Sequence, residues 1–345
     1  MSTTFLTIAA NGANPLTEMY FLIGFATVII LMLIIDLGFF NSEPHKISNR
    51  EALTWSAVWI GTALIFCGFI YRYIGKDSAS DFLTAFLIEK ALSVDNLFVF
   101  VLIFSYFKVP GEYQHKVLFW GIIGAIMLRA LFIFSGVWLV EATYFPAIEI
   151  FGHSVRINAI LTVFGLFLIY AGVKSLKHNE EEEKDFSNNF TVKTIKKWFR
   201  VTHDYHQDKF WTWENGVRMA TPLFIVVAVV ETTDLIFAVD SIPAIFAVTN
   251  DPFILYTSNI FAILGLRALY FLLANSMSIF VYLHYGLAAI LSFIGIKMVI
   301  SPIYHISSTL SLSIVGGILF IAALVSVFFK PKDTKPELEK NLTVE

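Results

Sequence analysis

The sequence has little charge and almost no cysteine. Only 15% of its 345 residues are charged, against about 25% in ordinary soluble domains, and 57% are apolar. One cysteine, Cys67, excludes an intramolecular disulfide framework and a cysteine-based metal cage. A net charge of −3 is too small to indicate a nucleic-acid partner. The composition therefore predicts an integral protein of the lipid bilayer with no nucleic-acid partner.

The amino-terminal segment lacks the basic residues of a cleavable signal peptide. No Lys or Arg lies between Met1 and Thr17, ahead of the first apolar stretch. Because a signal peptide needs a positively charged n-region, we expect this first span to be retained.

Long apolar runs predict an all-α polytopic membrane protein. A helix needs about 20 apolar residues to cross a hydrocarbon core of about 30 Å, and the sequence offers about nine such spans. They lie near 18–40, 53–73, 81–106, 117–140, 156–176, 219–249, 257–275, 278–300 and 309–329. The sixth is long and contains Pro243, so we expect it to be broken or to end in a re-entrant piece.

Basic residues gather in four segments, which an odd number of spans places on one side of the membrane. These segments follow spans one and three, fill the loop 177–216 and form the C-terminal tail. Because short loops rich in Lys and Arg stay cytoplasmic, we predict a multi-pass protein of the bacterial inner membrane, with the N-terminus outside and the C-terminus cytoplasmic. Within the long loop, residues 191–200 resemble a basic amphipathic helix at the membrane surface.

Three short motifs recur in the same order along the chain. The sequence LRALF at 128–132 returns as LRALY at 266–270. Glu89 and Asp95 are six residues apart, and so are Asp234 and Asp240. Gly-Val-Lys at 172–174 returns as Gly-Ile-Lys at 295–297. Two consecutive three-span units enter the bilayer from opposite sides, which predicts the inverted 3+3 repeat of secondary transporters. Chance similarity among apolar segments is the alternative.

This repeat divides the chain into five parts. We predict two N-terminal spans in 1–76, repeat one in 77–176, a charged cytoplasmic loop in 177–216, repeat two in 217–300, and the last span with a cytoplasmic tail in 301–345.

Ionisable side chains inside the predicted spans point to function. Each costs about 2.5–3.5 kcal/mol at a helix centre, so they must meet one another, water or an ion. Three bases cannot neutralise six acids, and a divalent cation, protons or both would balance the excess. The acids are Asp36, Glu89, Asp95, Glu231, Asp234 and Asp240, and the bases are Lys90, Arg129 and Arg267.

The predicted metal ligands are oxygen donors from both copies of the repeat. Oxygen ligands suit Mg²⁺, Ca²⁺ and Mn²⁺, whereas Zn²⁺ and copper prefer His, Cys or Met, so the chemistry leaves three hard ions open. Residues six apart lie about 120° apart on a regular helix, so joint chelation needs ligands from the other repeat or local unwinding. The ligand candidates are Glu89, Asp95, Asn96, Asp234, Asp240 and Ser241.

The remaining intramembrane charges are interpreted as proton carriers or charge-pair members. Arg129 and Arg267 are expected to be structural counter-ions, because a guanidinium stays cationic. Lys90 is expected to pair with an acid. Glu231 is either a proton carrier or the partner of an arginine, and Asp36 is either part of the site wall or an interfacial cap.

Two segments carry a family resemblance. The sequences EKALSVDN at 89–96 and ETTDLIFAVDSIP at 231–243 resemble the signature segments of the TerC family of integral membrane proteins, particularly its Alx-type bacterial members. The resemblance extends over about residues 20–330 and implies manganese export across the inner membrane, with Mn²⁺ as the transported substrate. The implied site residues are the six ligand candidates together with Glu231.

The leading hypothesis is a transporter, not an enzyme. Manganese would enter from the cytoplasm and leave outward as the repeats rock, with protons replacing it on the carboxylates. One alternative is an accessory membrane protein that loads metal onto exported enzymes or assists membrane-protein assembly. Another is an intramembrane aspartyl protease with Asp95 and Asp240 as a dyad, although the Gly-rich Asp motif expected of such an enzyme is lacking.

Overall fold

The computed structural model describes residues 23–31, 34, 49–146, 148–150, 153–176, 190–214, 216–274, 283–304 and 306–328. Asp36 and the C-terminal tail lie outside this part of the chain. Asp95 and Asp240 are placed in helices, but their side chains are not among the described atoms.

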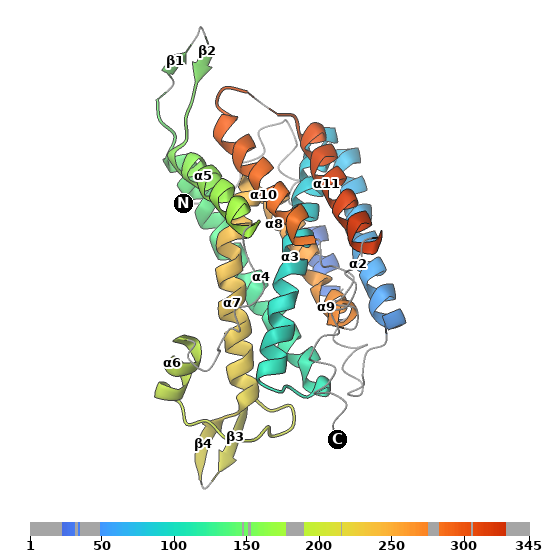
Figure 1. The fold of residues 1–345 in the computed structure, drawn as a ribbon, viewed down its shortest axis with the longest axis vertical. Helices are drawn as coiled ribbons and strands as arrows, with labels where there is room; N and C mark the ends of the chain where they lie inside the picture. Colours follow the sequence, from blue (N-terminus) through green and yellow to red (C-terminus); the bar gives the residue numbers. More distant parts are fainter. Residues whose placement is uncertain are drawn as a thin grey trace.

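Helices make up most of the described chain (Figure 1), which confirms the predicted all-α membrane fold. They are α2 (Asn49–Tyr73), α3 (Lys76–Tyr106), α4 (Gly111–Ala142), α5 (Ala159–Ser175), α6 (Phe190–Trp198), α7 (Pro222–Phe246), α8 (Pro252–Leu264), α9 (Leu266–Ala274), α10 (Leu283–Ile300) and α11 (Ser308–Phe328). Two antiparallel hairpins pair β1 (Ile148–Ile150) with β2 (His153–Val155), and β3 (Trp211–Glu214) with β4 (Val217–Ala220). The total of nine spans remains a prediction.

Several helices have the length and apolar character of membrane spans. Within the described residues these are α2, α4, α7, the stretch Pro252–Ala274 and most of α11, while α5 and α10 are apolar but shorter. The 31-residue α3 is also long, but Glu89, Lys90 and Asp95 interrupt its apolar run. Large apolar side chains on the outer faces, such as Met127 and Trp138 of α4, are about 70% exposed, as expected for surfaces that contact lipid.

The α4 helix shows how its sequence selects the inner face. Its buried residues recur every three or four positions, which places them on one side of a helix with 3.6 residues per turn. That face carries one charged residue, Arg129, in an otherwise apolar or small set: Val117, Leu118, Gly121, Ile122, Ala125, Ile133, Val137 and Val140. The helix therefore turns Arg129 into the bundle, while exposed apolar residues such as Met127 and Trp138 face lipid.

The prediction that the sixth span is broken is wrong. The α7 helix is continuous from Pro222 to Phe246 although it contains Pro243. Because Pro243 lies three residues before the helix end, its missing N–H removes one hydrogen bond close to a terminus, where the helix tolerates the loss. The break lies in the next span, where α8 ends at Leu264 and α9 begins at Leu266.

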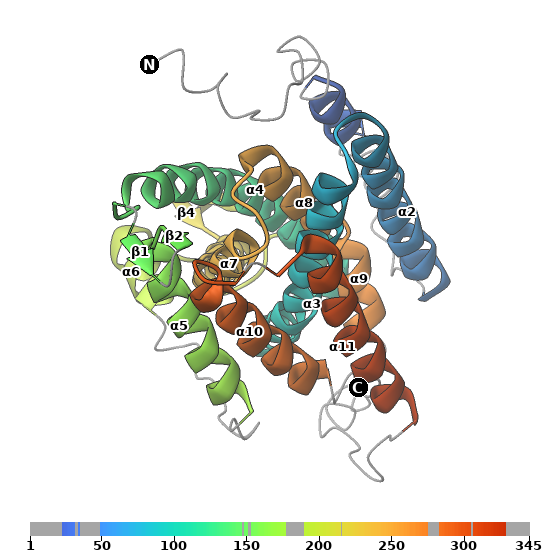
Figure 2. The same ribbon diagram turned by 90° about the horizontal axis from the view of Figure 1, so that it is seen from above.

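The helices α3 and α7 form the centre of the bundle (Figure 2). They pack against each other, α3 also packs on α8, and α7 also packs on α4 and α5, while α2 lies at the periphery on α3 and α9. If the predicted repeat relates α3 to α7 and α4 to α8, the pairs α3–α8 and α7–α4 are equivalent. The observed packing is the one that such a relation requires.

The pair α5 and α10 gives a more detailed observation of the same kind. A Cβ atom on Gly172 would lie 2.7 Å from the backbone oxygen of Ala288, and one on Gly295 would lie 2.6 Å from that of Gly165. Gly165 precedes Gly172 by seven residues, as Ala288 precedes Gly295, so the two contacts are reciprocal. The inverted repeat stays a prediction, and this reciprocity is an observation in its favour.

The connecting segments lie at the two ends of the bundle. The β1–β2 hairpin is at one end, and α6 with the β3–β4 hairpin is at the other (Figure 1). The predicted basic amphipathic helix is confirmed as α6, which buries Val192 and Ile195 and exposes Trp198. The Tyr205 hydroxyl donates a 2.7 Å hydrogen bond to the carbonyl of Phe107, which fastens the α6 end to the end of α3. Both hairpins were missed from the sequence.

Candidate functional site

Arg129 of α4 organises a buried ion-pair network at the centre of the bundle. Its Nη1 donates to Oε1 of Glu89 on α3, and both side chains are almost completely buried. Nη2 lies 3.5 Å from Oδ1 of Asp234 on α7. Nη1 also donates to Oδ1 of Asn259 on α8 at 3.2 Å. One guanidinium therefore joins acidic residues of both predicted repeats.

The chemistry of this network explains why an arginine stands at position 129. A guanidinium offers five donors in a planar fork and keeps its charge when buried, so it can serve several acceptors at once. Its single positive charge cannot balance both Glu89 and Asp234 if both are ionised. The network is thus suited to hold a further cation or a proton.

Glu231 brings a third carboxyl group to the same region. It lies three residues before Asp234 on α7, so the two side chains share one helix face. Its carboxylate packs directly on Gly124 of α4, where a Cβ atom would overlap it. The glycine therefore allows the carboxylate to approach the α4 backbone, a contact that sequence reasoning missed.

Several buried oxygen atoms near these residues have no hydrogen-bond partner within the described part of the chain. They belong to the two central helices and include carboxylate and hydroxyl oxygens, the donor types that hard divalent ions prefer. On α3 they are Glu89 Oε2 and Ser93 Oγ, and on α7 they are Glu231 Oε2 and Ser241 Oγ. Asn96, another ligand candidate, is also buried on α3.

The complete predicted ligand set cannot be traced in the structure. Asp95 and Asp240 lie in α3 and α7, but their side chains are not described, and Asp36 lies outside the described residues. Among the described side chains, no group of three His, Cys, Asp or Glu is close enough to hold a metal ion. The six-ligand metal site therefore stays a prediction.

Lys90 contacts a backbone carbonyl of α8. Its Nζ donates a 3.1 Å hydrogen bond to the carbonyl of Ala262, close to the C-terminal end of α8, rather than pairing with an acid among the described residues. A helix C-terminus carries partial negative charge, which stabilises the ammonium group there. Lys90 thus supports the break between α8 and α9.

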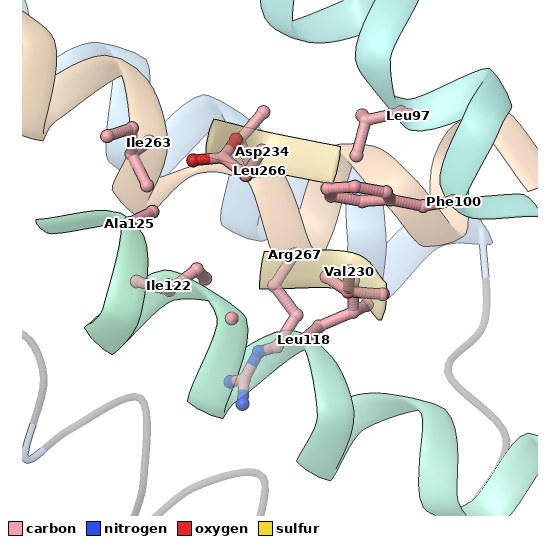
Figure 3. A pocket seen from close by; sticks show the side chains of 11 residues that line it. Leu97, Phe100, Leu118, Ile122, Ala125, Val230, Asp234, Ile263, Leu266 and Arg267 are labelled. Atoms are coloured by element: carbon pink, nitrogen blue, oxygen red, sulfur yellow. The ribbon is translucent and has the colours of Figure 1, made fainter. Parts of the chain in front are cut away.

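A small pocket adjoins the network (Figure 3). Its volume of about 20 Å³ accommodates a water-sized body, for which about 10–15 Å³ is needed, but no organic substrate. Asp234 and Arg267 supply its charged groups, and the rest of the wall is apolar or small: Leu97, Phe100, Leu118, Gly121, Ile122, Ala125, Val230, Ile263 and Leu266.

The two repeat-related arginines have different surroundings. The guanidinium of Arg267 lies beside the turn of α4 that carries Leu118 and Ile122, and it points away from Asp234 (Figure 3). Arg129, by contrast, contacts Asp234 directly. The counter-ion role of Arg267 stays a prediction.

Comparison with known proteins adds the family. The model of the Integral membrane protein TerC family matches residues 74–334, a stretch that begins before α3 and contains both signature segments. The chain belongs to the TerC family. It is therefore a multi-pass integral membrane protein, as the composition predicted. No solved structure matches this TerC chain.

Several bacterial relatives match over nearly their whole length. An uncharacterized membrane protein, STKORF319, of Myxococcus xanthus is 43% identical over 88% of this chain and 91% of its own. A protein of Escherichia coli K12, whose name includes the words "membrane-bound redox modulator Alx", is 43% identical over 90% of this chain and 95% of its own. An uncharacterized membrane protein of Rickettsia bellii is 41% identical over 89% and 96%.

Proposed function

We propose that this TerC-family protein exports a divalent metal ion, manganese, through a carboxylate site between α3 and α7. The observation that carries the proposal is the buried bridge from Arg129 to Glu89 and Asp234, which joins acids of the two predicted repeats. In transporters built from inverted repeats, the substrate site lies at the repeat interface near the membrane midplane. An ion bound there would be reached from either side as the repeats rock.

The chemistry around this bridge favours a hard divalent cation as cargo. The unpartnered buried oxygens near the bridge belong to carboxyl and hydroxyl groups, and the adjacent pocket has room for an ion or a water molecule only. Within the proposal, Asp95, Asp240, Asn96 and Ser241 complete the ligand set. Manganese is chosen over magnesium and calcium on the family resemblance, and protons are proposed to replace it on the carboxylates.

We propose transport rather than catalysis, and transport rather than direct thiol chemistry. The name of the Escherichia coli relative refers to redox modulation. The present chain has one cysteine, Cys67, whose thiol is half-buried on α2 against the carbonyl of Ala79. One cysteine cannot form an intramolecular disulfide, so thiol exchange within a single chain does not supply a redox activity.

The proposed location is the bacterial inner membrane, with the α6 end of the bundle in the cytoplasm. The basic loop that contains α6 supports this orientation, because Lys and Arg are retained on the cytoplasmic side. In this orientation the β1–β2 end faces outward.

Ion-resolved efflux from proteoliposomes tests the proposal. We expect wild-type protein to move Mn²⁺ faster than Mg²⁺ or Ca²⁺, and Asp95→Asn and Asp240→Asn each to abolish the flux. Asp208→Asn is the matched control, because Asp208 is an exposed acid of the α6 end paired with Lys116. Unchanged Mn²⁺ flux in both site variants, with normal insertion, would overturn the site and favour the accessory role.

A further inference from the structure

A layer of side chains lies between the small pocket (Figure 3) and the α6 end of the bundle. Three helices contribute Phe100 of α3, Leu118 of α4 and Leu266 of α9 to the pocket wall. The helices α3 and α9 run toward the α6 end, and α4 begins there. The residues of these helices that lie about one turn closer to that end are Phe104, Gln114 and Tyr270.

Tyr270 holds this layer together. Its ring meets the ring of Phe104 edge-on, with 5.3 Å between the centroids, and both side chains are only 2% exposed. Its hydroxyl donates a 3.1 Å hydrogen bond to Oε1 of Gln114. The amide nitrogen of Gln114 in turn donates to the carbonyl of Val109, in the turn between α3 and α4. The helices α3, α4 and α9 therefore meet at one buried phenol group.

Position 270 distinguishes the two predicted repeats. It corresponds to Phe132 in the motif at 128–132, so both copies carry the ring but only the second carries the hydroxyl. The helices also differ, because α4 is continuous through its copy of the motif, whereas α9 begins at Leu266 directly after α8. The polar contact of the layer is thus carried by a separate helix of nine residues.

Gly265 and Lys90 make the separation of α9 from α8 possible. A Cβ atom at Gly265 would lie 2.6 Å from Nζ of Lys90, so the glycine leaves room for the ammonium group. That group donates to the carbonyl of Ala262 near the end of α8. Because Lys90 supplies a donor to the end of α8, α9 can tilt without depriving this carbonyl of its partner.

We propose that Tyr270 is the gating residue of the ion pathway on the α6 side of the carboxylate site. While its hydroxyl is bonded to Gln114, the rings of Tyr270 and Phe104 separate the pocket from the α6 end. Tilting of α9 about Gly265 breaks this bond, moves the ring away and admits an ion to Asp234. A hydrogen bond suits this task, because water can replace each partner when the two separate. The inference rests on the proposed transport function.

Thiol accessibility inside the pocket tests the gate without measuring transport. Cys67→Ser removes the sole cysteine, and Ala125→Cys then places one thiol in the pocket wall, with Ile122→Cys as a second reporter. The pocket volume of about 20 Å³ leaves no room for a membrane-impermeant thiosulfonate reagent while the layer is closed. We expect slow labelling from the α6 side, and labelling about fivefold faster with Tyr270→Phe, which keeps the ring. This ratio corresponds to about 1 kcal/mol at about 1.4 kcal/mol per tenfold, the net contribution of a typical hydrogen bond.

A second variant and a matched control accompany this experiment. Gln114→Met removes the hydrogen-bond acceptor at similar size and should also accelerate labelling. Adding Tyr270→Phe to it should have no further effect, because both substitutions remove the same bond. The control Tyr256→Phe makes the same chemical change on α8, where the ring packs on Phe25 and Phe134, and should leave the rate unchanged.

The side from which the reagent acts separates a gate from loosened packing. In the Cys67→Ser background, Lys197→Cys on the exposed face of α6 identifies the membrane preparation that presents the α6 end to the reagent. We expect Tyr270→Phe to accelerate labelling of the pocket thiol from this side only. Equal acceleration from both sides would overturn the gate, because a general loosening of the bundle has no preferred side.

The outcomes distinguish the gate from the proposed cargo. Unchanged labelling in both Tyr270→Phe and Gln114→Met overturns the gate, even if manganese efflux is observed. Conversely, one-sided acceleration together with absent manganese flux would sustain the gate and refute manganese as the cargo.

Discussion

Replacing Arg129 by glutamine should destabilise the protein in a pH-dependent way. In the native structure its guanidinium pairs with the fully buried Glu89 and with Asp234. Removing one partner of a buried ion pair costs about 3–5 kcal/mol, because a buried charge is left without compensation. In the Arg129→Gln variant, we expect the unpaired Glu89 to take up a proton on folding.

The size of the effect follows from the cost of that proton. Protonating a carboxyl group with an ordinary pKa of about 4.3 costs about 3.7 kcal/mol at pH 7 and about 1 kcal/mol at pH 5, at 1.36 kcal/mol per unit. The free energy of unfolding of Arg129→Gln should therefore be about 3–4 kcal/mol below wild type at pH 7. The deficit should shrink as the pH falls, because the unfolded chain then also carries the proton.

Equilibrium unfolding in mixed detergent micelles, followed by tryptophan fluorescence, measures this deficit. The control is the double variant Glu89→Gln with Arg129→Gln, which removes both charges and should be less destabilised at pH 7 than Arg129→Gln alone. The reasoning fails if Arg129→Gln costs under about 1 kcal/mol at pH 7, if its cost does not change with pH, or if the two substitutions are simply additive.

Two further predictions concern packing and the surface. Gly295→Ala should lower the free energy of unfolding by about 1–3 kcal/mol, because its Cβ would press on the backbone oxygen of Gly165. Gly61→Ala, which has open space around it, is the control and should cost nothing in the same thermal or detergent unfolding. Equal effects would contradict the close contact between the helices. The Lys116 ammonium lowers the pKa of Asp208, so their stabilisation is present above the unfolded pKa of about 3.9 and lost as the pH falls through the lower folded value. Since Asp208 is largely exposed, Asp208→Asn should cost under about 1 kcal/mol at pH 7 and nothing at pH 2, and a larger loss in pH-resolved unfolding would refute a simple surface pair.

The membrane fold could be predicted because its signals are local. Apolar runs of about 20 residues set the helices, and the alternation of basic and apolar residues at 191–200 identified α6. The burial of Arg129 and Glu89 also followed from the cost of exposing charge to lipid. The hairpins were missed because strands of three or four residues leave no periodic pattern.

The partners of individual charges depended on tertiary packing and could not be predicted in the same way. Lys90 binds a carbonyl of α8, which is available because that helix ends at Leu264. The apolar pattern shows no break there, and Pro243 had indicated one in the preceding span instead. Arg129 and Arg267 occupy matching positions in the two motifs, but Arg129 pairs with Asp234 whereas the guanidinium of Arg267 points away from it. Asn259, a lone amide in an apolar helix, was the one signal that could have pointed to a further partner of Arg129.

Direct binding of Mn²⁺ to the purified protein tests the central claim most directly. Free Mn²⁺ gives an electron paramagnetic resonance spectrum that weakens on binding, so titration reports affinity without any transport step. We expect saturable binding that Glu89→Gln and Asp234→Asn weaken strongly and that the surface variant Asp208→Asn leaves unchanged. Binding of equal strength in all four proteins would contradict a manganese site built on the carboxylates of α3 and α7.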